Sequence, residues 1–292
     1  MIPLFKNNYY RKIGSGKTFS IEFDKMPSST SNHTEESKKA AIELYDLKQG
    51  ELHLCYSGGV DSEFMVNVFI ELGIPFTPVL LRYNPNYNYH DLEYSLKFCK
   101  LKNLNPKIID IDFNHFVKSG KLLDLCKMIK TSDWRRAGVC EGISKLDGTV
   151  ILGDCEPYVN LDQETKIWNF SVDEHEFAWG NFYIQHGIHG TPYFGGYTPE
   201  KCMSFLYNQR IQDVINNKLP GKLGTATSKV IVYNSNNNFK LEPRPKYHGY
   251  EYVYHSELYD TNLFKDIEDE LKQYNGHYAM EIQSFIKMIT HV

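Results

Sequence analysis

The sequence predicts an α/β fold built on a parallel sheet that is covered by helices on both faces. Between residues 51 and 154, short apolar segments alternate with longer amphipathic segments. This pattern is typical of strands that are buried on both sides and joined by crossover helices. The chain has 292 residues, of which 41% are hydrophobic and 23% charged. A globular chain of this length buries about 75% of its unfolded surface, so it can form a core without disulfides.

The first 24 residues predict a β-hairpin. Two alternating runs, 8–13 and 18–23, are joined by the turn-forming segment Gly14-Ser15-Gly16-Lys17. A polar stretch then leads into an expected helix over 35–47, and Gly50 follows it in the position where glycine usually ends a helix.

Strands and helices alternate in the next hundred residues. The expected strands cover 51–56, 78–83, 107–112 and 149–152, and the expected helices cover 62–72, 91–104, 116–129 and 134–146. In the first of these helices, Phe64, Val68 and Leu72 recur at helical spacing. Consecutive strands joined by helices predict a doubly wound sheet.

The pattern becomes less regular after Asp154, which predicts a mixed α+β region. The expected elements there are an irregular hairpin over 166–185, strands over 230–233 and 250–254, and helices over 198–217, 263–274 and 278–290. Thr198-Pro199 begins the first of these helices, because proline is favoured at the first helical position. These changes divide the chain into 1–48, 49–160 and 161–292.

Charge, cysteine spacing and hydropathy exclude several classes of protein. The 32 basic and 36 acidic residues give a net charge of −4, which disfavours a protein that coats duplex nucleic acid. Six scattered cysteines without a C-x-x-C pair are typical of reduced thiols. No apolar run is long enough to cross a membrane, and the amino terminus lacks a secretory signal. We therefore expect a cytoplasmic protein.

The most informative segment is Ser57-Gly58-Gly59-Val60-Asp61-Ser62, between the first expected strand of the sheet and the following helix. The first N–H groups of a helix lack internal partners and the helix dipole is positive there, so the position suits a phosphate. Glycines let the backbone approach an anion closely, and the two serines add hydroxyl donors. Asp61 would repel a bare phosphate, so its presence indicates a bridging Mg²⁺.

A second glycine-rich segment, Gly16-Lys17-Thr18, resembles the end of a Walker loop. Arg11 stands where that loop requires its first glycine, and an alternating run rather than a helix follows. We therefore do not interpret it as a phosphate site.

The 57–62 segment resembles the S-G-G-x-D-S motif of the PP-loop, or N-type, ATP pyrophosphatases, whose members include the synthetase domain of asparagine synthetase, GMP and NAD synthetases and tRNA thiouridylases. The resemblance covers about residues 50 to 155 and is closest in style to the asparagine synthetase domain. It implies a Rossmann-like sheet of the adenine nucleotide alpha hydrolase type, with an ATP-binding unit over 49–160 and a substrate-specific region over 161–292.

The resemblance also implies a mechanism. A substrate oxygen attacks the α-phosphate of ATP, pyrophosphate leaves, and a nitrogen or sulfur nucleophile captures the adenylated intermediate. The loop stabilises the charge that develops on pyrophosphate. The implied nucleotide-binding residues are Tyr56, Ser57, Gly58, Gly59, Val60, Asp61, Ser62, Leu81, Arg82 and Gly153, with adenine over the ends of the first two strands.

The end of the fourth strand carries a second acidic motif, Gly153-Asp154-Cys155-Glu156. Strand ends on one edge of a parallel sheet face a common crevice, so Asp154 or Glu156 could join Asp61 as a Mg²⁺ ligand. The motif resembles the second motif of the asparagine synthetase domain, from which Cys155 and Pro157 depart, and each acid could equally be a solvated loop residue.

Three basic residues are candidates for contacts with the phosphates. Arg135 precedes the fourth strand, beside Arg136, and a guanidinium matches phosphate geometry. Members of the asparagine synthetase group place a catalytic lysine in their C-terminal part, which implies Lys222 or Lys229 here; no motif decides between them. All three could instead be solvated surface side chains.

Four functions remain open from the sequence. The first is an ATP-dependent ligase that amidates a carboxylate or carbonyl group; Met1-Ile2 lacks the catalytic cysteine of a glutaminase domain, so ammonia or an amine would come from solution or a partner protein. The second is a tRNA- or nucleobase-modifying enzyme, by thiolation or 7-deazaguanine-type chemistry, with a basic patch that includes Arg244 and Lys246. A sulfonucleotide reductase and a binding-only protein rank lower.

Two further questions stay open from the sequence. Among the cysteines, Cys99, Cys140 and Cys155 are candidate sulfur carriers. A homodimer is an open alternative for the oligomeric state.

Overall fold

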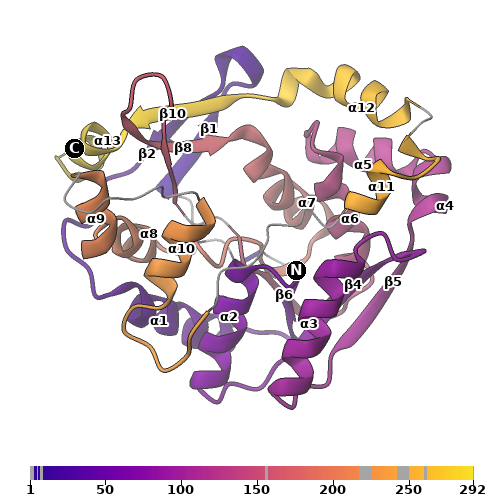
Figure 1. Cartoon of the computed structure of the whole chain (residues 1–292), viewed down its shortest axis with the longest axis horizontal. Helices are drawn as coiled ribbons and strands as arrows, with labels where there is room; N and C mark the ends of the chain where they lie inside the picture. Colours follow the sequence, from indigo (N-terminus) through magenta and orange to yellow (C-terminus); the bar gives the residue numbers. More distant parts are fainter. Residues whose placement is uncertain are drawn as a thin grey trace.

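A computed structural model of the chain describes residues 3–4, 6, 9–154, 157–216, 225–241, 250–259 and 262–291. Its centre is a five-stranded sheet in the order β5-β4-β3-β6-β9, and every pair of neighbouring strands is parallel. The five strands are β3 (Leu52–Cys55), β4 (Thr77–Asn84), β5 (Lys107–Asp112), β6 (Thr149–Leu152) and β9 (His189–Thr191). The prediction of a parallel, doubly wound α/β sheet is confirmed (Figure 1).

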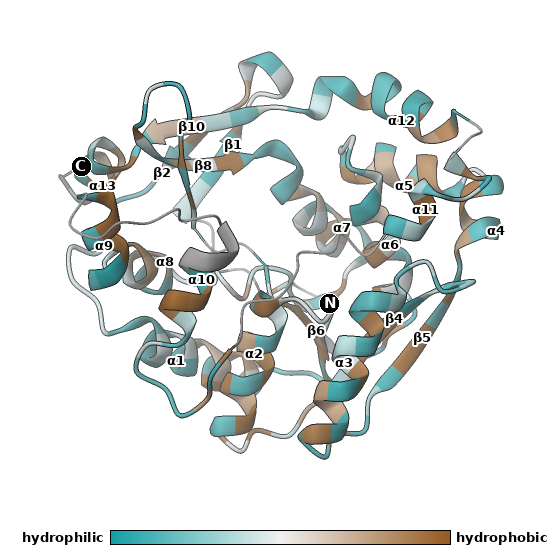
Figure 2. Ribbon diagram, in the orientation of Figure 1, coloured by the Kyte–Doolittle hydropathy of each residue, from teal (hydrophilic) through white to brown (hydrophobic). Residues whose placement is uncertain are grey.

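Helices cover both faces of this sheet. One face carries α1 (His33–Asp46), α2 (Val60–Glu71) and α3 (Tyr89–Leu101), and the other carries α4 (Phe113–Lys118), α5 (Lys121–Ile129), α6 (Trp134–Ile143) and α7 (Ala178–His186). Brown hydrophobic segments alternate with teal hydrophilic ones along α2 and α3 in Figure 2. Each helix therefore turns an apolar stripe towards the sheet.

Alternation along the strands separates two hydrophobic cores. Leu54 and Leu80 pack into the core with α1, α2 and α3, whereas their sequence neighbours Cys55 and Val79 pack into the core with α4 to α7. Successive side chains of a strand point to opposite faces, so a sheet that is buried on both sides needs apolar residues at every position. All four residues of β3 are buried, and its one polar member, His53, is hydrogen-bonded to the backbone oxygen of Asp147 at 2.8 Å.

The two ends of the chain pack together beside the sheet. The predicted hairpin is confirmed as β1 (Tyr10–Ile13) and β2 (Ser20–Phe23). A three-stranded antiparallel sheet combines β7 (Tyr158–Leu161), β8 (Trp168–Asp173) and β10 (His277–Glu281). Phe285 of α13 (Ile282–His291) stacks on Phe170 at 3.9 Å and meets Phe23 edge-on at 4.9 Å between ring centroids. Aromatic packing thus joins the first and last parts of the chain.

Several predictions about the C-terminal region are wrong. The segment 166–185 contains β8 and α7 instead of a hairpin, and β8 pairs with β7 and β10, which the sequence analysis missed along with β9. Residues 230–233 belong to α10 (Thr225–Tyr233) and 250–254 to α11 (Glu251–Tyr254), although both were expected to be strands. Their β-branched and aromatic residues favour strands locally, but packing against other elements decided otherwise.

The remaining differences concern helix bounds. The helix expected over 198–217 is two helices, α8 (Pro199–Leu206) and α9 (Gln209–Ile215), and the one expected over 116–129 is divided between α4 and α5 at Gly120. α12 (Leu263–Leu271) agrees with prediction, whereas the segment expected as a helix over 278–290 begins with β10 before α13. None of the helices within the described ranges combines the length and the apolarity that crossing a membrane requires.

Candidate functional site

The 57–62 loop joins β3 to α2 in a conformation that requires glycine. Gly59 is the N-cap of α2, and Gly58 has a φ of +85°. A Cβ atom added to Gly58 would lie 2.5 Å from the backbone oxygen of Asp91. Glycine is therefore needed here both for the left-handed backbone and for the close approach of α3.

The two serines of the loop hold its shape. The Ser57 and Ser62 hydroxyls are 3.1 Å apart, the Ser57 N–H donates to Ser62 Oγ at 3.2 Å, and the Gly59 N–H donates to Ser57 Oγ at 3.3 Å. Ser62 Oγ also lies 3.1 Å from the Gly59 carbonyl oxygen. These bonds close the loop into a compact turn in front of the first turn of α2, where backbone N–H groups favour an anion.

Asp61, in the first turn of α2, is bound by two side chains from α10. The Lys229 ammonium donates to Asp61 Oδ2 at 2.9 Å, and the Tyr233 hydroxyl donates to Asp61 Oδ1 at 2.7 Å. The Tyr233 ring stacks on Phe64 of α2 with centroids 4.3 Å apart, which fixes the two helices side by side. Lys229 and Tyr233 are four residues apart and thus share one face of α10.

The end of β6 meets the loop at the point where the strand order reverses. A Cβ atom on Gly153 would lie 3.0 Å from the Cα atom of Ser62, so glycine allows the two segments to touch. Asp154 follows, and its Oδ2 accepts a hydrogen bond from Arg136 at 3.0 Å. In doubly wound sheets, ligands bind in the crevice between the two strands at this switch point, here β3 and β6.

Arg136 is the centre of a buried ion-pair network. Besides Asp154, its guanidinium contacts Glu176 at 3.3 Å, and it lies over the ring of Trp179 with 4.3 Å between Cζ and the ring centroid. Burial and the negative charge of Asp154 raise the pKa of Glu176 and Arg136 lowers it, with a net rise to about 7. A carboxyl group that titrates near neutral pH next to a cavity is characteristic of functional sites.

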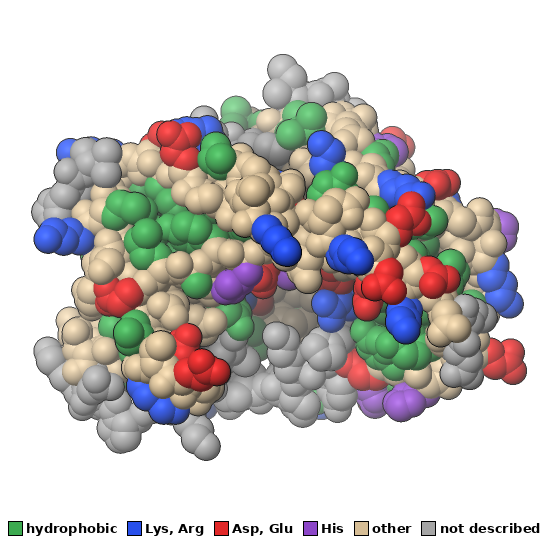
Figure 3. All heavy atoms as spheres, turned by 90° about the horizontal axis from the view of Figure 1, so that it is seen from above, with side chains coloured by type: hydrophobic (Ala, Val, Ile, Leu, Met, Phe, Trp, Pro, Cys, Tyr) green, Lys and Arg blue, Asp and Glu red, His purple; other side chains and the backbone are tan. Residues whose placement is uncertain are grey.

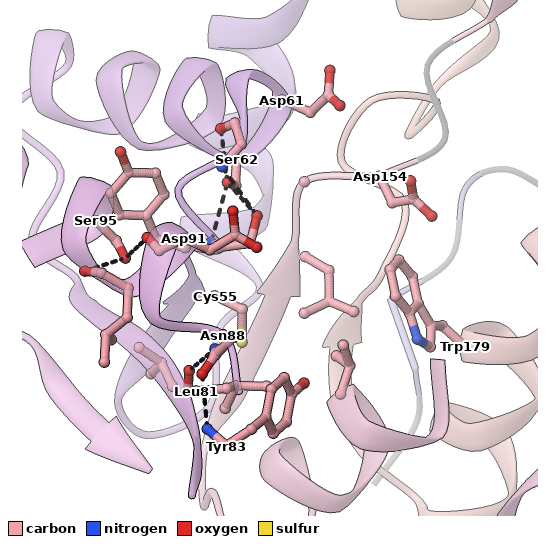
Figure 4. A pocket seen from close by; sticks show the side chains of 18 of the residues that line it. Cys55, Asp61, Ser62, Leu81, Tyr83, Asn88, Asp91, Ser95, Asp154 and Trp179 are labelled. Carbon is pink, nitrogen blue, oxygen red and sulfur yellow. Dashed lines mark hydrogen bonds between the residues drawn. The ribbon is translucent and has the colours of Figure 1, made fainter. Parts of the chain in front are cut away.

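A cavity of about 240 Å³ opens between these elements (Figure 4). Its polar lining includes Ser57, Asp61, Ser62, Asn88, Asp91 and Asp154, and its apolar lining includes Cys55, Val79, Leu81, Leu152 and Trp179. Figure 4 shows Asp61 and Ser62 at one end and Leu81 and Tyr83 at the other. The site thus combines a polar end at the loop with an apolar end over β4.

Eight residues predicted from the sequence line this cavity. They are Tyr56, Ser57, Gly59, Asp61, Ser62, Leu81, Gly153 and Asp154. Gly58 and Val60 belong to the same loop. The Tyr56 ring is buried against Phe98, and its hydroxyl donates to Glu63 at 2.8 Å; its side chain therefore supports the loop from behind.

Two predicted arginines lie elsewhere. Arg82 does not line the cavity, because its guanidinium pairs with Asp110 at 2.6 and 2.7 Å on the neighbouring strand. Arg135 also turns away and binds Asp133 at 2.6 Å, so the next residue, Arg136, is the one that reaches Asp154. Lys222, Cys155 and Glu156, as well as Arg244 and Lys246, lie outside the described residues.

Sequence reasoning missed several residues that border the site. Tyr233 was not recognised because 230–233 was expected to be a strand, and Trp179 because 166–185 was expected to be a hairpin. Asp91 was not singled out because acidic residues are common in the first turn of a helix. A helical interpretation of 225–233 would have placed Tyr233 beside Lys229, since residues four apart are neighbours on a helix.

The described cysteines are poor candidates for sulfur chemistry. Cys55, Cys99, Cys126, Cys140 and Cys202 are all buried. Burial raises the pKa of Cys99 to about 11 and that of Cys140 well above its usual range. Reactive cysteines need a thiolate, which these environments disfavour.

Two carboxylates of the cavity could serve a metal ion. Within the ranges that the structure describes, no three His, Cys, Asp or Glu residues are grouped to hold a metal. Asp61 and Asp154 nevertheless line the same cavity, one from each side of the switch point. Mg²⁺ in nucleotide sites commonly takes only one or two carboxylates and completes its shell with phosphate oxygens and water, so the residues present fit a Mg²⁺–nucleotide pair.

Comparisons with known proteins add little to this geometry. No family model and no curated protein matches the sequence. Among solved structures, a predicted subunit of a tRNA methyltransferase from Methanocaldococcus jannaschii matches 58% of this chain and 89% of its own at 17% identity, with a TM-score of 0.30. NMN synthetase from Francisella tularensis matches 74% of this chain and 100% of its own at 17% identity, with a TM-score of 0.32. Because these values are low, the functional argument rests on the site itself.

Proposed function

We propose that this chain is an ATP-dependent adenylating enzyme of the PP-loop type, which splits ATP into AMP and pyrophosphate. The observation that carries the proposal is the position of the Ser57–Ser62 segment, which follows β3 at the switch point of a parallel sheet and leads into the N-terminus of α2. That combination of glycine loop, helix N-terminus and crevice binds the phosphates of a nucleotide in α/β proteins.

Different residues at the polar end of the cavity are assigned to different parts of the triphosphate. The loop and the first turn of α2 bind the β- and γ-phosphates, and Lys229 lies beside Asp61 on the opposite wall. Arg136, held by Asp154 and Glu176, supplies a second positive charge. Preorganised donors of this kind stabilise the charge on a leaving pyrophosphate. We assign to Lys229 the role that the sequence left open between Lys222 and Lys229, and to Arg136 the role expected of Arg135; Lys222 lies outside the described residues.

Mg²⁺ would be held by Asp61 and Asp154, where it would neutralise phosphate charge. Each of these carboxylates is already paired with a cation, Asp61 with Lys229 and Asp154 with Arg136. Those pairs fix the positions of the two carboxyl groups, which both line the cavity.

The acceptor we favour is a small molecule with a carboxylate or carbonyl group, which is adenylated and then amidated by ammonia or an amine. The net charge of −4 supports a small acceptor over a tRNA. On the face drawn in Figure 3, Lys and Arg side chains are interspersed with Asp and Glu and form no continuous basic patch. The burial of the described cysteines supports nitrogen over sulfur as the nucleophile.

The experiment that tests the proposal is pyrophosphate release from ATP with Mg²⁺, measured over a panel of carboxylic acids, nucleobases and tRNA, each with and without ammonia. We expect release that depends on one acid of the panel and is lost in Asp61→Asn, with AMP as the second product. Release of inorganic phosphate and ADP instead would contradict the proposal, as would equal rates in Asp61→Asn.

A further inference from the structure

Between the loop and the apolar lining, the cavity contains a carboxyl group, that of Asp91, which the proposed chemistry does not use. Asp91 lies in the first turn of α3, and its backbone oxygen accepts a hydrogen bond from Ser95 at 2.7 Å. Its side chain lines the cavity. In Figure 4 Asp91 lies between Ser62, at the loop, and Cys55 and Leu81 further along the cavity.

The carboxyl group of Asp91 has no partner of its own in the described ranges. No hydrogen bond and no ion pair reaches its oxygens from any residue there, in contrast to Asp61 and Asp154 in the same cavity. Burying a carboxyl group without a partner is costly. A ligand that bonds to this group would remove that cost.

The environment of Asp91 favours its protonated form. Burial and, to a smaller extent, the negative charge of Glu251 in α11 raise its pKa to about 7. Tyr83 of β4 faces it across the cavity and stays neutral because burial raises the pKa of its hydroxyl. Asp61 and Asp154 line the same cavity, where each is paired with a cation. None of these groups offers Asp91 a positive charge, so the acid and its carboxylate coexist near pH 7.

The surroundings suit the flat ring of a nucleobase. Val79 and Leu81 of β4, Leu152 of β6, Val139 of α6 and Trp179 of α7 line the same space. Apolar and aromatic walls with one polar group at the edge are typical of small-molecule sites, where the polar group sets orientation and specificity. The proposed phosphate loop lies next to this space, so a nucleotide bound there would direct its base into it.

We propose that Asp91 recognises the edge of the adenine base, accepting a hydrogen bond from the exocyclic amine and donating its own proton to the adjacent ring nitrogen. This inference rests on the proposed function. A protonated carboxyl group has one donor and one acceptor, which matches the amine and ring nitrogen that adenine presents side by side. An ionised carboxylate has acceptors only and would instead match the paired N–H donors of guanine. Asp91 therefore makes adenine selection dependent on pH.

The test is calorimetric binding of the α,β-methylene analogues of ATP and GTP between pH 5.5 and 8.5, in the presence of Mg²⁺. We expect the affinity of the wild type for the ATP analogue to fall about tenfold for each pH unit above 7, and its relative affinity for the GTP analogue to rise. Asp91→Asn should keep ATP binding within about threefold at pH 6 and lose the extra pH dependence, because an amide donates and accepts at any pH.

Two further variants make the test decisive. Asp91→Ala should weaken binding of the ATP analogue at least tenfold at pH 6, whereas Glu93→Gln, an exposed acid on the same helix, should follow the wild type at every pH. Thermal unfolding of each variant reports whether it is folded. Parallel pH profiles for the wild type and Asp91→Asn, or unchanged binding in Asp91→Ala, would overturn the role of Asp91 while leaving the adenylating function intact. A wild type that binds neither analogue would overturn both.

Discussion

The carboxyl groups of the cavity differ in their partners from one end to the other. At the loop, Asp61 is held by Lys229 and Tyr233, and Asp154 is held by Arg136. Further along the cavity, no cation of the described part of the chain pairs with Asp91, and burial together with the negative charge of Glu251 raises its pKa to about 7. The same residue type is thus paired with cations at the loop, whereas burial raises the pKa of the carboxyl group of Asp91. The first arrangement suits phosphates and a metal ion, and the second suits a neutral base.

The largest effect should follow from removal of the cation beside Asp61. Lys229→Met should lower the rate of pyrophosphate release by about 100- to 1,000-fold, in the range seen when a preorganised donor is removed from a site of developing charge. Tyr233→Phe should lower it by about tenfold, since it removes a single hydrogen bond to the carboxyl group of Asp61. Steady-state kinetics measures both. Lys127→Met, which breaks an exposed pair with Glu270, is the matched control and should leave the rate unchanged.

A second comparison separates Arg136 from its neighbour in sequence. Arg136→Met leaves Asp154 and Glu176 without their shared counter-charge, and breaking a buried pair in this way costs about 3–5 kcal/mol of the free energy of unfolding. Arg135→Met removes a more exposed guanidinium bound to Asp133, so the expected cost is about 1 kcal/mol or less. Urea denaturation measures both values. Equal losses in the two variants would contradict the central place of Arg136 in the network.

The sequence carried more information about the loop than about the residues that surround it. The strand–glycine–helix pattern at 57–62 is local: its strand, its turn and its helix cap are each specified by adjacent residues. The positions of Lys229 and Trp179 depend instead on contacts with distant segments: Asp61 is 168 residues away from Lys229, and Arg136 is 43 residues away from Trp179. Val230 and Tyr233 have strand propensity, and only packing of Tyr233 on Phe64 makes their segment a helix at the site.

The choice between Arg135 and Arg136 shows the same limit on a smaller scale. Both residues are in the first turn of α6, and the sequence gives no reason to prefer either. Asp133, the N-cap of α6, accepts hydrogen bonds from the Arg135 backbone and side chain, which directs Arg135 away from the cavity. Its neighbour then points towards Asp154, about 100° further around the helix. An error of one residue in the expected start of α6 would therefore exchange the directions expected for Arg135 and Arg136.

The glycines of the loop offer a smaller test of how closely its two walls approach. Gly58→Ala would place alanine in a left-handed backbone and press its Cβ atom against the backbone oxygen of Asp91. Gly73→Ala would also have a positive φ, of +66°, but no atom lies within 4 Å of its Cβ. We expect a loss of about 1 kcal/mol for Gly73→Ala from backbone strain alone, and a loss at least 1–2 kcal/mol greater for Gly58→Ala because the backbone of α3 must move. Thermal unfolding separates them. Similar losses would show that α3 does not press on the loop.

The smallest predicted effect concerns the pH dependence of stability at the apolar end. The pKa of Asp91 is raised in the folded state, so the folded chain binds more protons than the unfolded chain between about pH 4 and 7, and its stability falls as the pH rises through that window. Asp91→Asn has no group that titrates at this position, so it lacks this pH-dependent fall in stability. It should match the wild type near pH 4.5 and exceed its free energy of unfolding by about 1–2 kcal/mol at pH 8, with the half-buried position reducing the effect below that of a fully buried acid. Urea denaturation at the two pH values, with Glu93→Gln as the control, measures the difference. A variant that is less stable than the wild type at pH 8 would mean that the carboxylate of Asp91 has a stabilising partner, and the contrast between the two ends of the cavity would then disappear.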